Sequence, residues 1–170
     1  EGSLWKTPLE LDALNVPWMD PEEAARRGIV KESYAKYLFH MTLGHHGFWS
    51  SSPIFLVAAI GLLSLLRGRR PMRAVAWITL ALTVILLAFY TYNPKARNYG
   101  GSAQGLRWLF WLIPFWVLML PAGLDALADR PWLRRAAVLA LFISVMSVGY
   151  AMRGPWSNPW FQDMMEHLGL

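Results

Sequence analysis

The sequence contains no cysteine, which excludes disulfide bonds, thiolate metal sites and thiol-based catalysis. Charge is also scarce, since only 16% of the 170 residues are Asp, Glu, Lys or Arg. By contrast, 55% are hydrophobic, ten are Trp, and the mean hydropathy is +0.30. This balance excludes a disordered chain, a secreted disulfide-stabilised domain and a typical nucleic-acid-binding protein. We therefore expect an integral membrane protein.

Four stretches are apolar over most of the roughly 20 helical residues that a bilayer core requires. They are residues 50–66, 74–92, 107–124 and 135–152. Because lipid leaves no partner for an open backbone, each stretch is expected to be helical. The predicted fold is an all-α membrane protein, with a lead-in at 1–49, a four-helix transmembrane domain at 50–152 and an amphipathic tail at 153–170.

Local signals refine these spans. Ser50, Ser51 and Ser52 precede Pro53, a pattern typical of a helix N-cap followed by proline in the first turn. Pro114 and Pro121 predict a kink or local unwinding in the third span. The fourth span contains Ala, Ser and Gly side chains that suit close helix packing, namely Ala136, Ala137, Ala140, Ser144, Ser147 and Gly149.

The short connections predict the orientation, because arginines cluster between spans one and two and between spans three and four. These arginines are Arg67, Arg69, Arg70, Arg73, Arg130, Arg134 and Arg135. Both connections are expected on the cytoplasmic side of a bacterial inner membrane, with both termini and the 93–106 loop outside.

The lead-in holds seven of the eleven acidic residues, as expected for a solvent-facing segment. A short helix is predicted from Asp20 to Gly28, and a second from about 32 to 42 that lies on the outer surface. The apolar stripe of the second helix is predicted to be Tyr34, Tyr37, Leu38 and Met41. Since the chain begins with Glu1 and shows no signal peptide, we expect a processed or truncated piece.

Three histidines, His40, His45 and His46, precede the first span. No Asp or Glu lies close to them in sequence, and none of them lies inside a span, so neither a zinc site nor a bound haem or chlorophyll is expected. Two interpretations remain open. Either His46 and Gly47 form a tight turn that leads into the first span, or the imidazoles contact an anionic group.

A second cluster occupies residues 92–108, where Gly100, Gly101 and Gly105 fall within six positions. Their N–H groups can approach a phosphate closely, and Lys95 and Arg107 supply positive charge. Arg107 opens the third span, so it either grips a phosphate bidentately or snorkels to lipid head groups.

The same cluster offers Tyr99 and Gln104 as polar residues that can line a sugar site, although core packing explains Tyr99 equally well. It lacks the GK[ST] ending of a P-loop, so ATP binding is excluded. No Ser-His-Asp set or carboxylate pair can be assembled from the outer loops, so no catalytic residue is assigned.

Together the segments GHHGFWSSSPIFL (44–56) and NYGGSAQGLRWLFWLIPFWVL (98–118) resemble two signatures near the C-terminal end of GT-C-type glycosyltransferases. The resemblance is carried by Gly44, His46, Gly47, Phe48 and Pro53 in the first segment. In the second it is carried by Tyr99, Gly100, Gly101, Gly105, Arg107 and Trp108.

The resemblance implies that the chain binds a polyprenyl-phosphate sugar donor at the outer face. The expected ligands are Arg107, Lys95, the glycine N–H groups and His45 or His46. The catalytic carboxylate of such enzymes lies far upstream of these signatures, so this chain would be the C-terminal part of a longer protein or a non-catalytic descendant. The alternative is an accessory subunit of a large respiratory or photosynthetic membrane complex. Expected partners are membrane lipids and other membrane subunits or the missing N-terminal part, without nucleic acid.

Overall fold

The computed structural model describes residues 33–44, 46–68, 71–93, 107–154 and 159–168, and within these ranges its regular structure is entirely helical. Three segments are long and apolar enough to cross a membrane, as an integral membrane protein requires. They are α5 (Arg73–Tyr92), η2 with α6 (Arg107–Leu112 and Ile113–Ala126) and α7 (Pro131–Ala151). Twenty helical residues extend about 30 Å, the thickness of a bilayer hydrocarbon core.

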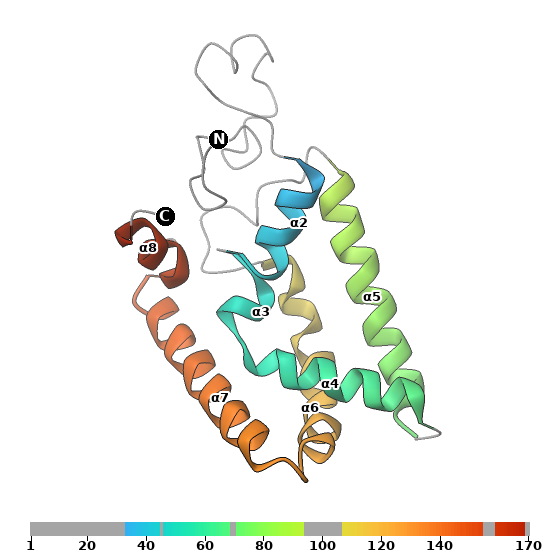
Figure 1. The fold of residues 1–170 in the computed structure, drawn as a ribbon. Helices are drawn as coiled ribbons and strands as arrows, with labels where there is room; N and C mark the ends of the chain where they lie inside the picture. The colour runs from blue at the N-terminus through green and yellow to red at the C-terminus, as the bar shows by residue number, and fades with distance from the viewer. Residues whose placement is uncertain (1–32, 45, 69–70, 94–106, 155–158, 169–170) are drawn as a thin grey trace.

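The first predicted span differs from this pattern, because it is divided between the short helix α3 (Phe48–Ser51) and α4 (Ile54–Arg67). The fourteen residues of α4 extend only about 21 Å. Figure 1 shows that α4 lies crosswise to α5 and α7 and in front of α6. The prediction of four complete spanning helices is therefore borne out for three of them.

The predicted N-cap of this span is also wrong. Ser50 and Ser51 belong to α3, and Pro53 occupies the N-cap position of α4 without a side-chain hydrogen bond. Instead, the Ile54 N–H donates to Ser144 Oγ on α7 at 3.1 Å. The cap comes from 90 positions away in the sequence, so no local pattern reveals it.

The crossing of α4 and α6 is the closest helix contact, and two glycines make it possible. A Cβ atom on Gly61 would collide with the carbonyl oxygen of Met119, and one on Gly123 would collide with that of Val57. Because these neighbours are backbone atoms, they cannot move aside as a side chain would. Small residues therefore set the distance between the two helices.

The core surrounds Trp116 of α6. Phe48 stacks on Phe55 with ring centroids 4.6 Å apart, and its centroid lies 5.7 Å from that of Trp116. The Trp116 Nε1–H donates to Thr83 Oγ1 at 3.2 Å, and Thr83 Oγ1 donates to the Thr79 carbonyl at 2.7 Å. Since Thr83 lies at the middle of α5, the aromatic core is level with the centre of that helix.

Helix α2 (Tyr34–Thr42) fills the range predicted for the second lead-in helix, but it packs along α5. Its buried residues are Tyr37, His40 and Met41, whereas Tyr34 and Leu38 of the predicted stripe are exposed. The Tyr34 ring lies 5.4 Å from the ring of Tyr92, the last residue of α5. The helix thus begins at the end of α5 and follows it inward, as Figure 1 shows.

The proline-rich third span is loosened as predicted. Its first six residues form the 3₁₀ helix η2, and α6 begins at Ile113 with Pro114 in its first turn. Proline has no N–H to donate back to the preceding turn, which accounts for the change of helix type at this point. Pro121 lies inside α6, between Met119 and Gly123 of the glycine crossing, and α6 continues through it, so the predicted loosening is confined to the region of Pro114.

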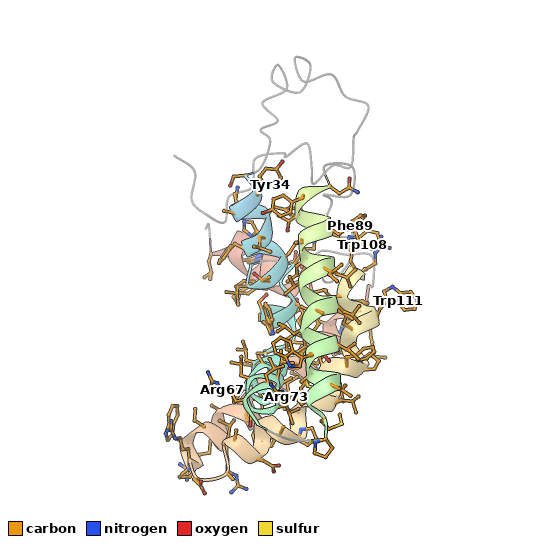
Figure 2. All side chains as sticks on the ribbon, turned by 90° about the vertical axis from the view of Figure 1, so that its right-hand side faces the viewer. Tyr34, Arg67, Arg73, Phe89, Trp108 and Trp111 are labelled. Atoms are coloured by element: carbon orange, nitrogen blue, oxygen red, sulfur yellow. The ribbon has the colours of Figure 1, made fainter. Side chains whose placement is uncertain are left out.

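The arginine-bearing connections lie at the same end of the helices. Figure 2 places Arg67 and Arg73 at one end of α5 and Tyr34 and Trp108 toward the other. In Figure 1 the connection from α6 to α7, with Arg130, leaves from the same lower end.

Opposite the arginine end, α8 (Trp160–His167) packs on the last turns of α7, where the amphipathic tail was predicted. Most of α7 exposes apolar side chains, and only Ala137, Ser144 and Ser147 of its residues are buried. The predicted packing of its small residues therefore holds for one face, while Ala136 and Gly149 are exposed.

The glycine crossing makes a direct prediction. Gly61→Ala should lower the free energy of unfolding by about 1–3 kcal/mol, because the added methyl group forces the backbones of α4 and α6 apart. Gly149→Ala is the matched control, since a Cβ there meets no atom within 4 Å. Thermal unfolding in detergent, followed by tryptophan fluorescence, measures both. Equal midpoints for the two variants would show that the crossing does not limit stability.

Candidate functional site

The segment between α2 and α4 turns twice at glycines. The Gly44 N–H donates to the Phe39 carbonyl at 2.8 Å and ends α2, and the Gly47 N–H donates to the Gly44 carbonyl at 3.0 Å. Ser50 Oγ donates to the same Gly44 carbonyl at 2.6 Å. A Cβ on Gly44 would collide with His40, and one on Gly47 with Ser50. The turn is therefore held tightly by hydrogen bonds and by the absence of side chains at both glycines.

Two histidines are enclosed by this turn. His40 is 0% exposed and His46 is 8% exposed. Burial favours the neutral form of an imidazole, so the pair is suited to hydrogen bonding rather than to carrying charge. Within the described residues no three His, Asp or Glu side chains come together, so this pair offers at most two ligands to a metal ion.

A cavity of about 280 Å³ lies beside this turn, between three helical segments. Most of its wall is apolar, and its polar groups are the hydroxyls of Ser51, Ser52 and Ser147. Ser51 Oγ is buried and has no hydrogen-bond partner among the described residues. The remaining lining residues are Gly47, Phe48, Phe55, Phe110, Ile113, Val148 and Ala151. Such a cavity fits a hydrocarbon chain that carries one or two polar atoms.

Arg107 stands at the start of η2, on top of an aromatic stack. Its guanidinium carbon lies 5.6 Å from the centroid of the Trp108 ring. Trp108 in turn stacks on Tyr90 of α5, with centroids 4.7 Å apart and planes inclined by 10°. Cation–π contact of this kind favours a position of the guanidinium over the ring by about 0.5–1 kcal/mol. Arg107 is thus attached to both α5 and η2 and lies three residues before Phe110 of the cavity wall.

The predicted site residues divide into two groups. Arg107 and His46 are described, the first on the aromatic stack and the second in the buried turn. Six others lie outside the described residues, namely Lys95, Gly100, Gly101, His45, Tyr99 and Gln104. The predicted tight turn at His46 and Gly47 is present, and the alternative role of His46 as an anion ligand stays a prediction.

Some residues of this region were not anticipated. Ser51 was assigned to a helix cap, Trp108 was named only as part of the family resemblance, and Tyr90 was not singled out. Tyr90 and Trp108 belong to different spans, so their pairing depends on helix packing that no local pattern encodes. A signal for Ser51 was present in the three consecutive serines, because one helix N-terminus does not require three hydroxyl groups.

The serine pair in the turn gives a second prediction. Ser50→Ala should lower the free energy of unfolding by about 1 kcal/mol, because the hydrogen bonds from Ser50 Oγ to the Gly44 and Gly47 carbonyls are lost. Ser51→Ala should leave it unchanged or raise it slightly, because that hydroxyl is buried without a hydrogen bond among the described residues. Chemical denaturation of the two variants in the same detergent makes the comparison, and a larger loss for Ser51→Ala would contradict it.

Comparison with known proteins identifies no relative of this chain. No family model, no curated protein and no solved structure matches the chain. The function must therefore be argued from the site itself.

Proposed function

We propose that this chain is a membrane unit that binds the phosphate of a polyprenyl-linked sugar donor, in the manner of the C-terminal part of a GT-C-like glycosyltransferase. The observation that carries the proposal is the guanidinium of Arg107 over the ring of Trp108, which stacks on Tyr90, in the same helix as Phe110 of a cavity suited to a hydrocarbon chain. A planar guanidinium in a fixed orientation matches the oxygens of a phosphate group.

The remaining polar residues take supporting roles in this proposal. Lys95 and the N–H groups of Gly100 and Gly101 complete the phosphate site, and His45 or His46 contributes a hydrogen bond. Tyr99 and Gln104 are the residues proposed to contact the sugar. No residue of this chain is assigned a catalytic role in the proposal, and the chemistry is assigned to a separate catalytic unit.

In this proposal the chain crosses the membrane four times, and one of the crossings is interrupted. The long segments α5, η2–α6 and α7 form three crossings. The fourth consists of α2, α3 and α4 in succession, because α2 begins at the end of α5 and α4 leads to its start. The turn between them is level with the centre of α5, as the contacts from Phe48 through Trp116 to Thr83 indicate.

An interrupted helix is stable in lipid only where other helices enclose the open backbone. Here the hydroxyl of Ser50 bonds the Gly44 carbonyl, and the hydroxyl of Ser144 bonds the Ile54 N–H. Interrupted crossings of this kind occur at substrate sites of membrane transporters, where the polar backbone faces the ligand. The turn lies next to the cavity lined by Ser51, Ser52 and Ser147, which we call the serine cavity. This position supports ligand binding at the interrupted crossing of this chain.

The membrane side follows from the arginines. Because Arg67, Arg73 and Arg130 lie at one end of the helices, that end is cytoplasmic under the positive-inside rule. Arg107 and the serine cavity then face the outer half of a bacterial inner membrane, and both termini lie outside.

A second candidate is a non-catalytic accessory subunit of a large respiratory or photosynthetic complex. It is favoured by the broad apolar face of α7 and by Trp111, which is 84% exposed and points away from the other helices in Figure 2. Lipid would cover this surface equally well, so ligand binding at Arg107 decides between the two functions.

The orientation is tested with single cysteines in this cysteine-free chain. Ser102→Cys should react with a membrane-impermeant maleimide on intact cells, because it lies in the proposed outer loop. Gly68→Cys should react only after the membrane is opened, because it follows Arg67 at the cytoplasmic end. The reverse labelling pattern would invert the topology.

The phosphate site is tested with Arg107→Lys. Lysine keeps the charge but lacks the planar pair of donors, so the affinity for a polyprenyl phosphate should fall about ten- to a hundredfold. The free energy of unfolding should stay within about 1 kcal/mol of that of the parent chain. Binding is measured by the quenching of tryptophan fluorescence in detergent.

Two further variants make this test specific. Gly101→Val should also weaken binding, because it blocks close approach of the backbone without changing charge. Arg134→Lys, at the opposite end, is the control and should bind as the parent chain does. Unchanged affinity in Arg107→Lys would favour a snorkelling role for Arg107 and with it the accessory-subunit function.

A further inference from the structure

Helix α8 is fixed to the outer end of α7 by two side-chain hydrogen bonds. The Trp160 Nε1–H donates to Ser147 Oγ at 2.8 Å, and the Tyr150 hydroxyl donates to a carboxylate oxygen of Asp163 at 2.5 Å. Pro159, just before α8, is fully buried. These contacts hold the two helices together at defined points and leave space between them.

That space is a groove of about 470 Å³, which does not include Arg107 and shares only Ser147 with the cavity beside the Gly44–Gly47 turn. Its walls are mainly the apolar side chains of Phe142, Ile143, Met146 and Trp160. Gly149 faces open space, because a Cβ there would meet no atom within 4 Å. Phe142 and Met146 also belong to the exposed face of α7, so the groove opens sideways toward the surrounding hydrocarbon.

A cation stands at one end of this groove. Arg153 follows the last turn of α7, lines the groove and is exposed. It forms no ion pair with any residue in the part of the chain that the structure describes. The carboxylate of Asp163 nearby is already engaged by the Tyr150 hydroxyl. The groove therefore joins an apolar channel to an exposed cation that forms no ion pair within the described residues.

We propose that the groove between α7 and α8 binds an anionic glycerophospholipid of the bilayer, with one acyl chain along Met146 and Gly149 and the phosphate on Arg153. The charge of Arg153 complements the phosphate, and the apolar wall complements the chain. A bilayer lipid is the fitting occupant because the groove opens sideways to the hydrocarbon, where such lipids are already present. This site is independent of the polyprenyl-phosphate function of Arg107.

The charge is tested first. The full chain is reconstituted in vesicles of phosphatidylcholine with phosphatidylglycerol, extracted in mild detergent, and analysed by native mass spectrometry for retained lipid. The parent chain should retain one phosphatidylglycerol in preference to phosphatidylcholine, and Arg153→Gln should lower that retention about tenfold. Arg130→Gln, which removes an exposed arginine at the other end of α7, is the matched control and should retain lipid normally.

The groove is tested separately with Gly149→Leu, which fills it from a position where the added side chain has room. This variant should lose phosphatidylglycerol retention while keeping the unfolding temperature of the parent. Val145→Leu enlarges an exposed residue of the same helix that does not line the groove, and it should retain lipid.

Three results would overturn the proposal. They are equal retention of both phospholipids, normal retention in both Arg153→Gln and Gly149→Leu, and displacement of phosphatidylglycerol by an equimolar polyprenyl phosphate. The last result would assign the groove to a polyprenyl chain instead. Arg107→Lys should keep phosphatidylglycerol retention, so failure of the proposed function and failure of this site can be distinguished.

Discussion

The contact of α4 with α6 is the constraint on which the other packing depends. Gly61 and Gly123 let each helix rest on a backbone carbonyl of the other, and this short separation brings Phe55 against Trp116. Trp116 then reaches Thr83 of α5, so one close crossing connects three helices. Without the hydrophobic effect between lipid-exposed helices, such close packing and a few hydrogen bonds must supply the association energy.

The crosswise position of α4 also explains why the chain turns at Gly44 and Gly47. A helix of this length that lies across α6 cannot extend along α5 as well, so the preceding residues must form a separate element. Helix α2 is that element, and the turn joins the two at the level of the aromatic core. The buried histidines and the serine cavity thus result from one packing geometry. They lie where the chain turns between α2 and α4 and does not continue as a single helix.

The sequence was sufficient for the features that depend on local composition. Three long apolar helices, the amphipathic tail and the loosening near Pro114 follow from hydropathy, periodicity and the missing N–H of proline. The break between α3 and α4, at Ser52 and Pro53, was not predicted, because the run from Ser50 to Arg67 is apolar enough for one helix. Its cause lies in contacts across the chain, such as the Ser144 cap on Ile54. The predicted buried face of α2 was partly wrong for a similar reason. Packing against neighbouring segments buries His40, which the apolar periodicity of α2 does not predict.

The distribution of cations gives the two proposed sites a common logic. Arg67 and Arg73 lie at one end of α5, which the proposed orientation makes cytoplasmic. In that proposal a cation at the opposite end runs against the positive-inside rule, so we expect an interaction that compensates its charge. Arg107 has the aromatic stack of Trp108 and Tyr90, whereas Arg153 lies at the end of an apolar groove and forms no ion pair within the described residues. An anionic lipid in the groove would give Arg153 such a pair, and a phosphate would add its charge to the contact that Arg107 makes with Trp108.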